Sequence, residues 1–183
     1  MRTAQYIKEI KIEDVPWHRL TTVYGRATLI PQYLNDLWEM QDMEKVRRAN
    51  YEILMNIEHQ NTLWHATPFT MIFLVRILEK ATEKSANNIC AKFIVGQLVN
   101  FFDYIEECYQ YANSMEHAEA LLEFSDLLHE DYLWSEVYNE LEDEIRYEDN
   151  PFPDDLFYSF YYYSHIVLLN GKEMIAQARK MYQ

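Results

Sequence analysis

Carboxylates are the side chains in this sequence with the clearest capacity for chemistry, and nearly half of them lie in one segment. Residues 93–145 contain fourteen aspartates and glutamates but no lysine or arginine. The whole chain has 30 acidic and 16 basic residues, so the remainder is balanced and the net charge of −14 resides in this segment. A surface of one sign attracts partners of the opposite charge and speeds their association. We call residues 93–145 the acidic segment.

Five of these carboxylates follow the spacing of a single helix face. Glu116, Glu119, Glu123, Asp126 and Glu130 are separated by alternating steps of three and four residues, which predicts an acidic stripe if the segment is helical. Like charges at these spacings destabilise a helix by about 0.2–0.5 kcal/mol per pair. Two interpretations follow: a solvated face that serves only solubility, or a surface that meets a basic partner.

Tyrosine is abundant, with fifteen residues, and several tyrosines alternate with the carboxylates of the acidic segment. Tyrosine is enriched at protein interfaces because its ring is buried there while its hydroxyl finds a partner. The alternative is that the rings pack between helices and leave only their hydroxyls at the surface. The predicted partner-binding residues are Asp103, Tyr104, Glu106, Glu107, Tyr111, Glu116, Glu119, Glu123, Asp126, Glu130, Asp131, Tyr138, Glu140, Asp143 and Glu144.

The histidines do not form a recognisable metal or catalytic site. His59 and His65 flank a connection between predicted helices, where only Glu58 is close in sequence, so we interpret them as hydrogen-bonding to the loop backbone. Asp126 and His129 have i, i+3 spacing, but the chain lacks the Glu-x-x-His motif of helical di-metal sites. We therefore predict no metal and no other cofactor.

The sequence also lacks the motifs of nucleophilic catalysis. Cys90 and Cys108 fall on a predicted apolar helix stripe that disfavours a thiolate. On one helix they would lie about 27 Å apart, too far for a disulfide. There is no glycine-rich phosphate loop, no Gly-x-Ser-x-Gly and no His-Glu-x-x-His. We predict that the protein is not an enzyme, and a helical hydrolase with an unrecognised site is the least favoured hypothesis.

Composition narrows the class of protein and of partner. Apolar residues make up 49% of the chain, enough for a sizeable core, and only 3 glycines and 5 prolines interrupt it, which favours long helices. A pI near 4.8 argues against nucleic acid or an anionic membrane as partner. No apolar run reaches the roughly 18 residues that span a bilayer, and no signal peptide is recognisable, so we expect a cytoplasmic protein.

Apolar periodicity predicts an all-α chain. Residues 1–16 are expected to form an N-terminal arm or short helix. Within 115–145 the periodic apolar set includes Val137, Leu141 and Ile145. The expected helices cover about residues 31–41, 43–59, 67–82, 86–112, 115–145 with a bend near 130–132, 154–170 and 172–183. This pattern favours one domain over 1–183, a small right-handed α-solenoid or HEAT-like array of antiparallel helix pairs with about seven or eight helices.

Residues that begin or end helices can also be named. Gly25 is expected in a turn, and Gly171 at the end of a helix. Thr28, Asp42 and Ser85 are the expected N-caps, because a side-chain oxygen at this position accepts a hydrogen bond from the first turn. Nothing in the sequence indicates a strand-rich region or a flexible linker.

A resemblance extends over about residues 17–80. It is carried by Trp17, Leu20, Tyr24, Gly25, Pro31, His59, Gln60, Thr62, Ala66 and Thr67. These positions resemble a bacterial family of HEAT-like helical-repeat proteins associated with toxin immunity. The resemblance implies a helical-repeat fold and, beyond it, an immunity role. It brings no catalytic residues, because the shared positions belong to turns between helices.

Together these observations predict a cytoplasmic immunity protein that neutralises a cognate bacterial toxin through an acidic, tyrosine-rich helical surface. The toxin is expected to be basic, for example a nuclease, because proteins that grip phosphates do so with lysine and arginine. The alternative is a helical-repeat scaffold or adaptor that binds a cellular protein or peptide. Neither hypothesis involves nucleic acid, membrane or a cofactor as partner.

Overall fold

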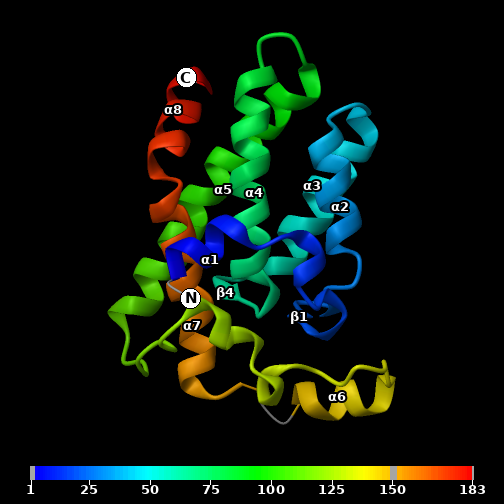
Figure 1. The fold of residues 1–183 in the computed structure, drawn as a ribbon, viewed down its shortest axis with the longest axis vertical. Helices are drawn as coiled ribbons and strands as arrows, with labels where there is room; N and C mark the ends of the chain where they lie inside the picture. Colours follow the sequence, from blue (N-terminus) through cyan, green and yellow to red (C-terminus); the bar gives the residue numbers. More distant parts are fainter. Residues whose placement is uncertain (1–2, 149–151, 183) are drawn as a thin grey trace.

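The structure, a computed structural model, describes residues 3–148 and 152–182 and is mostly α-helical, as predicted (Figure 1). The α-helices are α1 (Thr3–Glu9), α2 (Ile30–Glu39), α3 (Met43–Ile57), α4 (Ala66–Lys84), α5 (Ile89–Ser114), α6 (Glu140–Glu148), α7 (Asp154–Asn170) and α8 (Lys172–Tyr182). Short 3-10 helices occur at η1 (Ile12–Asp14), η2 (Trp17–Arg19), η3 (Phe124–Leu128) and η4 (Glu130–Tyr132). The expected short helix near the N-terminus corresponds to α1.

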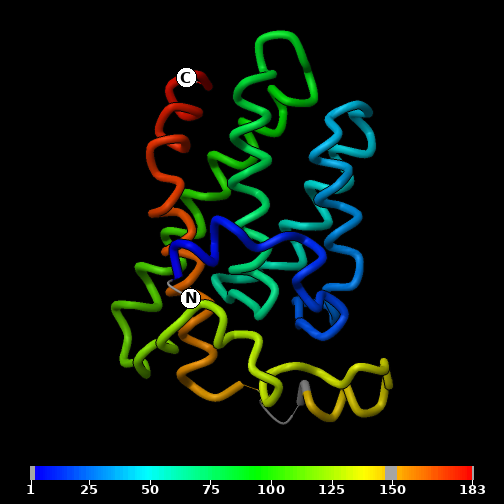
Figure 2. The backbone as a smooth tube through the Cα atoms, in the orientation of Figure 1, coloured from blue at the N-terminus to red at the C-terminus, as the bar shows by residue number. Residues whose placement is uncertain are grey.

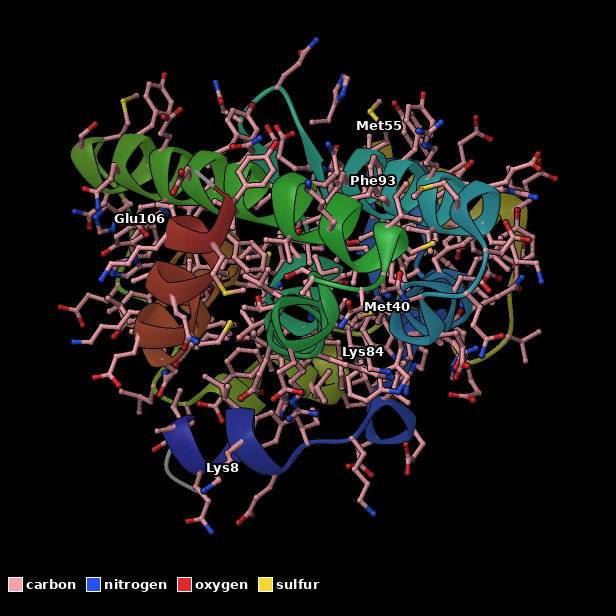
Figure 3. All side chains as sticks on the ribbon, turned by 90° about the horizontal axis from the view of Figure 1, so that it is seen from above. Lys8, Met40, Met55, Lys84, Phe93 and Glu106 are labelled. Atoms are coloured by element: carbon pink, nitrogen blue, oxygen red, sulfur yellow. The ribbon has the colours of Figure 1, made fainter. Side chains whose placement is uncertain are left out.

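Helix α4 lies at the centre of the packing. Its residues are apolar almost all round, and it contacts α2, α3, α5, α7 and α8. Viewed from above, these helices surround it, with α1 closing one side (Figure 3). The tube in Figure 2 shows α4 and α5 running side by side and joined by one tight connection. A helix without a polar face is stable only when neighbours cover it, so the rest of the chain is built around α4.

Caps set the ends of several helices. Asp42 caps α3 as predicted, because its Oδ1 accepts hydrogen bonds from Glu44 N at 2.9 Å and Lys45 N at 3.2 Å. Asn88, rather than Ser85, caps α5 by accepting from Ala91 N at 3.0 Å. Ser85 instead ends α4, where its hydroxyl donates to a carbonyl of the last turn.

Two other predicted ends have different outcomes. Gly171 follows α7 directly and its amide donates to carbonyls of the last turn, so the predicted helix end is confirmed. Thr28 is not a cap, since α2 begins after Leu29 without a side-chain hydrogen bond to its first turn.

Two short hairpins connect the helices. In the first, β1 (Thr21–Thr22) pairs with β2 (Gly25–Arg26), and Gly25 has φ 118°, which confirms the predicted turn. In the second, β3 (Glu58–His59) pairs with β4 (Thr62–Leu63). The intervening Gln60 and Asn61 have φ 51° and 65°, as a two-residue hairpin turn requires. Strands of two residues carry too little alternation to be predicted from sequence.

The predicted helix over 115–145 is wrong. Residues 115–123 are irregular, η3 and η4 follow, and only α6 is α-helical. Leu121 shows the reason, because both of its backbone groups bond to side chains of α7. Its amide donates to Ser159 Oγ at 2.8 Å, and its carbonyl accepts from the Tyr163 hydroxyl at 2.5 Å. Phe124 and Leu127 are fully buried. Core burial and these side-chain bonds therefore replace the helical hydrogen bonds of the segment.

Candidate protein-binding surface

The predicted acidic stripe does not exist as one helix face. Glu116 and Glu119 lie in the irregular stretch after α5, and Glu130 opens η4. Glu123 and Asp126 form the capping box of η3, in which Asp126 Oδ2 accepts from Glu123 N at 3.0 Å. Both of these carboxylates are thus engaged within the chain. The spacing of three and four residues was correct in the sequence, but the backbone does not make the turns that would align it.

Glu123 also ties the N-terminus to the acidic segment. Its Oε2 accepts a hydrogen bond from Thr3 Oγ1 at 3.0 Å, and the same hydroxyl oxygen accepts from Phe124 N at 3.2 Å. Phe124 packs against Tyr6, with ring centroids 5.5 Å apart. Residues of α1 and η3 therefore hold each other in place, and Glu123 has a structural role.

Arg19 anchors the middle of the acidic segment. Its Nε donates to Trp134 O at 2.6 Å, and its Nη1 donates to Glu130 Oε2 at 3.0 Å. The Trp134 amide returns a hydrogen bond to Arg19 O at 3.0 Å. The hydrogen bond from the Arg19 guanidinium to Glu130 holds the pKa of that exposed carboxyl below its ordinary value. Glu130 is therefore paired within the molecule, and the neighbouring Glu136 lies 2.9 Å from His18 Nε2 and 3.7 Å from Arg19 Nε.

Arg26, on β2, is the strongest link between the first hairpin and α6. Its Nε and Nη2 bind the two oxygens of Asp143 at 2.6 and 2.7 Å. Its remaining hydrogens reach His18 O at 2.8 Å, Ser135 O at 2.7 Å and Ser135 Oγ at 3.0 Å. All of the donors of the guanidinium are therefore used. With 6% of the Arg26 side chain and 11% of the Asp143 side chain exposed, this is a nearly buried, bidentate ion pair.

Two aromatic rings complete the Arg26 site. The guanidinium carbon lies 5.5 Å from the ring centroids of both Trp134 and Tyr138, a distance typical of cation–π contacts. Trp134 is buried, whereas Tyr138 remains exposed. Tyr138 and Asp143 were both predicted to bind a partner. In the structure Asp143 is paired internally, whereas Tyr138 stays largely exposed.

Helix α6 docks on the body through polar groups. Asp143 faces Arg26, and Arg146 donates to Leu133 O at 3.0 Å. Burial lowers the pKa of the Arg146 guanidinium. The apolar set of this region is divided, since Leu133 and Trp134 are buried whereas Val137, Leu141 and Ile145 are exposed. Figure 1 shows α6 beneath the first hairpin, apart from the helices that surround α4.

The carboxylates of α5 are partly paired as well. Asp103 forms an ion pair with Arg179 of α8. Glu106 lies 2.6 Å from His165 Nδ1, and the His165 ring stacks on Tyr109 with centroids 4.0 Å apart. Both carboxylates connect α5 to the C-terminal helices, which the sequence could not indicate because their partners are distant along the chain.

Tyr104 belongs to a polar cluster at the second hairpin. Its hydroxyl lies 3.0 Å from Glu58 Oε1 and 2.9 Å from Asn61 Oδ1, and Tyr161 donates to Asn61 O at 3.1 Å. Burial raises the pKa of Tyr104 to about 12 and that of the nearby Cys108 thiol to about 12. Both groups remain protonated at neutral pH. The cluster fixes the hairpin turn against α5 and α7 and gives Tyr104 a structural role.

After these internal contacts, several carboxylates of the acidic segment are left exposed and without an ion pair to any described residue. Among the predicted residues these are Glu107, Glu116, Glu119, Glu140 and Glu144, and Glu142 joins them. Asp131 is exposed beside His129 at 3.4 Å. The three from α6 occur within five consecutive residues. The predicted surface is therefore reduced to a smaller set, concentrated on α6 and after α5.

An open pocket of about 790 Å³ is bordered by Tyr111 and Glu116, two of the predicted partner-binding residues. The pocket lies between the end of α5, the start of α7 and the second hairpin, and its walls include Tyr158, Phe157 and Asp154. His117 stacks on Tyr158 with centroids 3.7 Å apart, and burial raises the pKa of Tyr158 to about 12. The pocket is lined by aromatic rings and carboxylates, consistent with the charge of the segment.

Within residues 3–148 and 152–182, no group of three or more histidine, cysteine, aspartate or glutamate side chains is placed to hold a metal ion. None of the described helices combines the length and apolar character needed to cross a bilayer. His65, considered above as a loop residue, is buried and its Nε2 lies 2.7 Å from Leu127 O, so it connects α4 to η3.

Comparison with known protein families, with characterised proteins and with solved structures gives no match. The resemblance of residues 17–80 to a helical-repeat immunity family remains a prediction.

Proposed function

We propose that this protein binds a basic protein partner and that it serves as the immunity protein of a cognate bacterial toxin. The observation that supports this proposal is the negative charge that stays unpaired on the acidic segment. After Arg19, Arg26 and Arg179 have neutralised their partners, the exposed carboxylates of α6 still have no described ion pair. A basic partner would neutralise them on binding.

The electrostatics favour a partner that itself binds nucleic acid, such as a nuclease toxin. Such proteins carry clusters of lysine and arginine that contact phosphates. A carboxylate surface can cover such a cluster and raise the rate of association through long-range attraction. The attachment of α6 by the Arg26–Asp143 pair adds to this, because a preformed surface loses less conformational entropy on binding.

The finer features of the fold and its location are part of this proposal. The neighbouring pairs α2–α3 and α4–α5 support a small right-handed HEAT-like array, and the packing of α7 and α8 on α4 would close that array at one end. We infer a single domain. Its proposed site of action is the cytoplasm, where a toxin would have to be neutralised before it reached its substrate.

The proposal is tested with a toxin encoded beside this protein, by co-expression and co-purification. We expect this protein to restore growth and to co-purify with the toxin. The triple variant Glu140→Lys, Glu142→Lys, Glu144→Lys should protect far less well. A control with the same change of net charge at exposed positions elsewhere, Glu13→Lys, Glu44→Lys, Glu83→Lys, should protect as the wild type does. Equal protection by both triple variants would contradict the electrostatic mechanism.

A scaffold or adaptor role is the second candidate. It is favoured by the number of carboxylates that the structure uses internally, including Glu123, Asp126 and Asp143. In that case the remaining charge would serve solubility. Binding to a cellular protein that is unchanged by the α6 triple variant, without rescue from any toxin, would support this role.

A further inference from the structure

Helix α6 has an unusual orientation for a surface helix. Its side toward the body carries Asp143 and Arg146, which are bound to Arg26 and to the Leu133 carbonyl. Surface helices normally turn their apolar stripe toward the core and their charges toward water. Here the ion pair with Arg26 fixes the polar side inward, so the apolar side is held in solvent.

The exposed side of α6 is apolar along its centre. Leu141 is 65% exposed and Ile145 is 51% exposed. They are four residues apart and therefore adjacent on one face, and Asp143 lies on the opposite face because successive residues are rotated by about 100°. Val137 and Tyr138, which immediately precede the helix, are also exposed. An exposed apolar patch with polar edges is typical of a protein-binding surface.

The charges beside this patch specify what can cover it. By the same helical rotation, Glu140 and Glu144 border one edge of the Leu141–Ile145 stripe, and Glu142 borders the other. None of the three forms an ion pair with a described residue. A second copy of the chain would bring these carboxylates against their own kind, and an anionic lipid surface would be repelled. A complementary occupant has an apolar stripe bordered by lysine or arginine.

We propose that α6 is the docking element for a basic amphipathic helix of the partner. Leucine or isoleucine at i, i+4 spacing on the incoming helix would pack on Leu141 and Ile145, and its cations would pair with Glu140, Glu142 and Glu144. This inference rests on the proposed function, because it names the contact through which a basic partner binds. It adds an apolar centre to a surface that charge alone would leave without a defined register.

The probe is a synthetic lysine-rich peptide of about 18 residues, long enough to be helical, with its leucines on one face. Its control is an isomer of the same composition in which the leucines are distributed around the helix. Binding of both is measured calorimetrically to the full chain. The test variant is Leu141→Ser, Ile145→Ser. The matched control is Ile89→Ser, Leu169→Ser, which removes two exposed aliphatic side chains elsewhere.

We expect the amphipathic peptide to bind at least about 10-fold more tightly than its isomer, because only it can bury both side chains together. The α6 variant should lose about 10- to 100-fold in affinity, and the control variant should bind as the wild type does. All four side chains are largely exposed, so circular dichroism should show unchanged folding for both variants.

Three results would overturn the inference. Equal binding of the two peptides would remove the role of the apolar stripe, but salt-dependent binding of both would leave the charge-based function intact. An unchanged affinity of the α6 variant would place the site elsewhere. Self-association that Leu141→Ser, Ile145→Ser abolishes, without peptide binding, would assign the patch to a second copy of the chain.

Discussion

The substitution Asp143→Asn should release α6 from the body of the protein. It keeps the size of the side chain but removes the negative charge that faces Arg26 at 2.6 and 2.7 Å. Breaking a buried ion pair by neutralising one partner typically costs about 3–5 kcal/mol, because the other charge stays buried without compensation. The exposed fractions of 6% and 11% for the two side chains place this pair in that class.

The loss should be local. Among residues 140–146, α6 contributes no apolar side chain to the hydrophobic core, and its attachment depends on Arg26, Arg146 and the residues just before the helix. A segment held in this way can detach while the helices around α4 stay folded. The free energy of global unfolding should therefore fall by less than the cost of breaking the pair. The opening of α6 alone should become easier by about 3 kcal/mol, or roughly 100-fold.

Hydrogen exchange measured by mass spectrometry can resolve the two regions. We expect amides of α6 in Asp143→Asn to exchange about 100-fold faster than in the wild type and amides of α4 to be unchanged. The control Glu142→Gln removes a charge from the same helix at an exposed, unpaired position and should leave α6 protected. The double variant Arg26→Met, Asp143→Leu should recover much of the protection, since an apolar pair needs no compensating charge. Unchanged exchange of α6 in Asp143→Asn would refute the role of this pair.

Three further predictions concern the stability of the fold. Burial lowers the pKa of His65 to about 4, so the unfolded chain binds more protons than the folded chain below about pH 6.5. The free energy of unfolding should therefore fall by about 2 kcal/mol from pH 7 to pH 5. Urea unfolding of the wild type and of His65→Gln at both pH values should show this difference only in the wild type. Asp42→Ala should cost about 1 kcal/mol through loss of the α3 cap, measured as a lower Tm, and an equal Tm would contradict it. Phe124→Ala should cost about 3–5 kcal/mol by opening a cavity among Tyr6, Phe69 and Tyr163; denaturant unfolding with a loss below 1 kcal/mol would show that η3 is not anchored by this ring.

The regular helices could be predicted from sequence because their signals are local. Three signals depend on residues within a few positions of one another. They are the apolar residues on nearly all faces of α4, the Asp42 cap of α3 and the glycine that follows α7. For the same reason Ser85 was predicted as the N-cap of α5 in place of Asn88, since both are polar residues before the same apolar stripe. Local patterns identified these regular helices and placed their ends to within a few residues.

The acidic segment could not be predicted in the same way, because its conformation depends on distant residues. Leu121 is held by Ser159 and Tyr163 of α7, and Asp143 is bound by Arg26, which is 117 positions away. The helical spacing of its carboxylates gave no information on these contacts. The apolar spacing of Leu141 and Ile145 was visible, but a stripe facing the core and a stripe facing a partner look the same in sequence.

The central claim is that the carboxylates of α6 attract a basic partner, and the association rate constant with the purified partner tests it most directly. Measured by stopped flow from 20 mM to 500 mM salt, the wild-type rate constant should fall steeply, because screening shortens the range of the attraction. Glu140→Lys, Glu142→Lys, Glu144→Lys should associate at least about 10-fold more slowly at low salt, and Glu13→Lys, Glu44→Lys, Glu83→Lys should stay close to the wild type. Rate constants that are independent of salt, or equally reduced in both triple variants, would contradict the account.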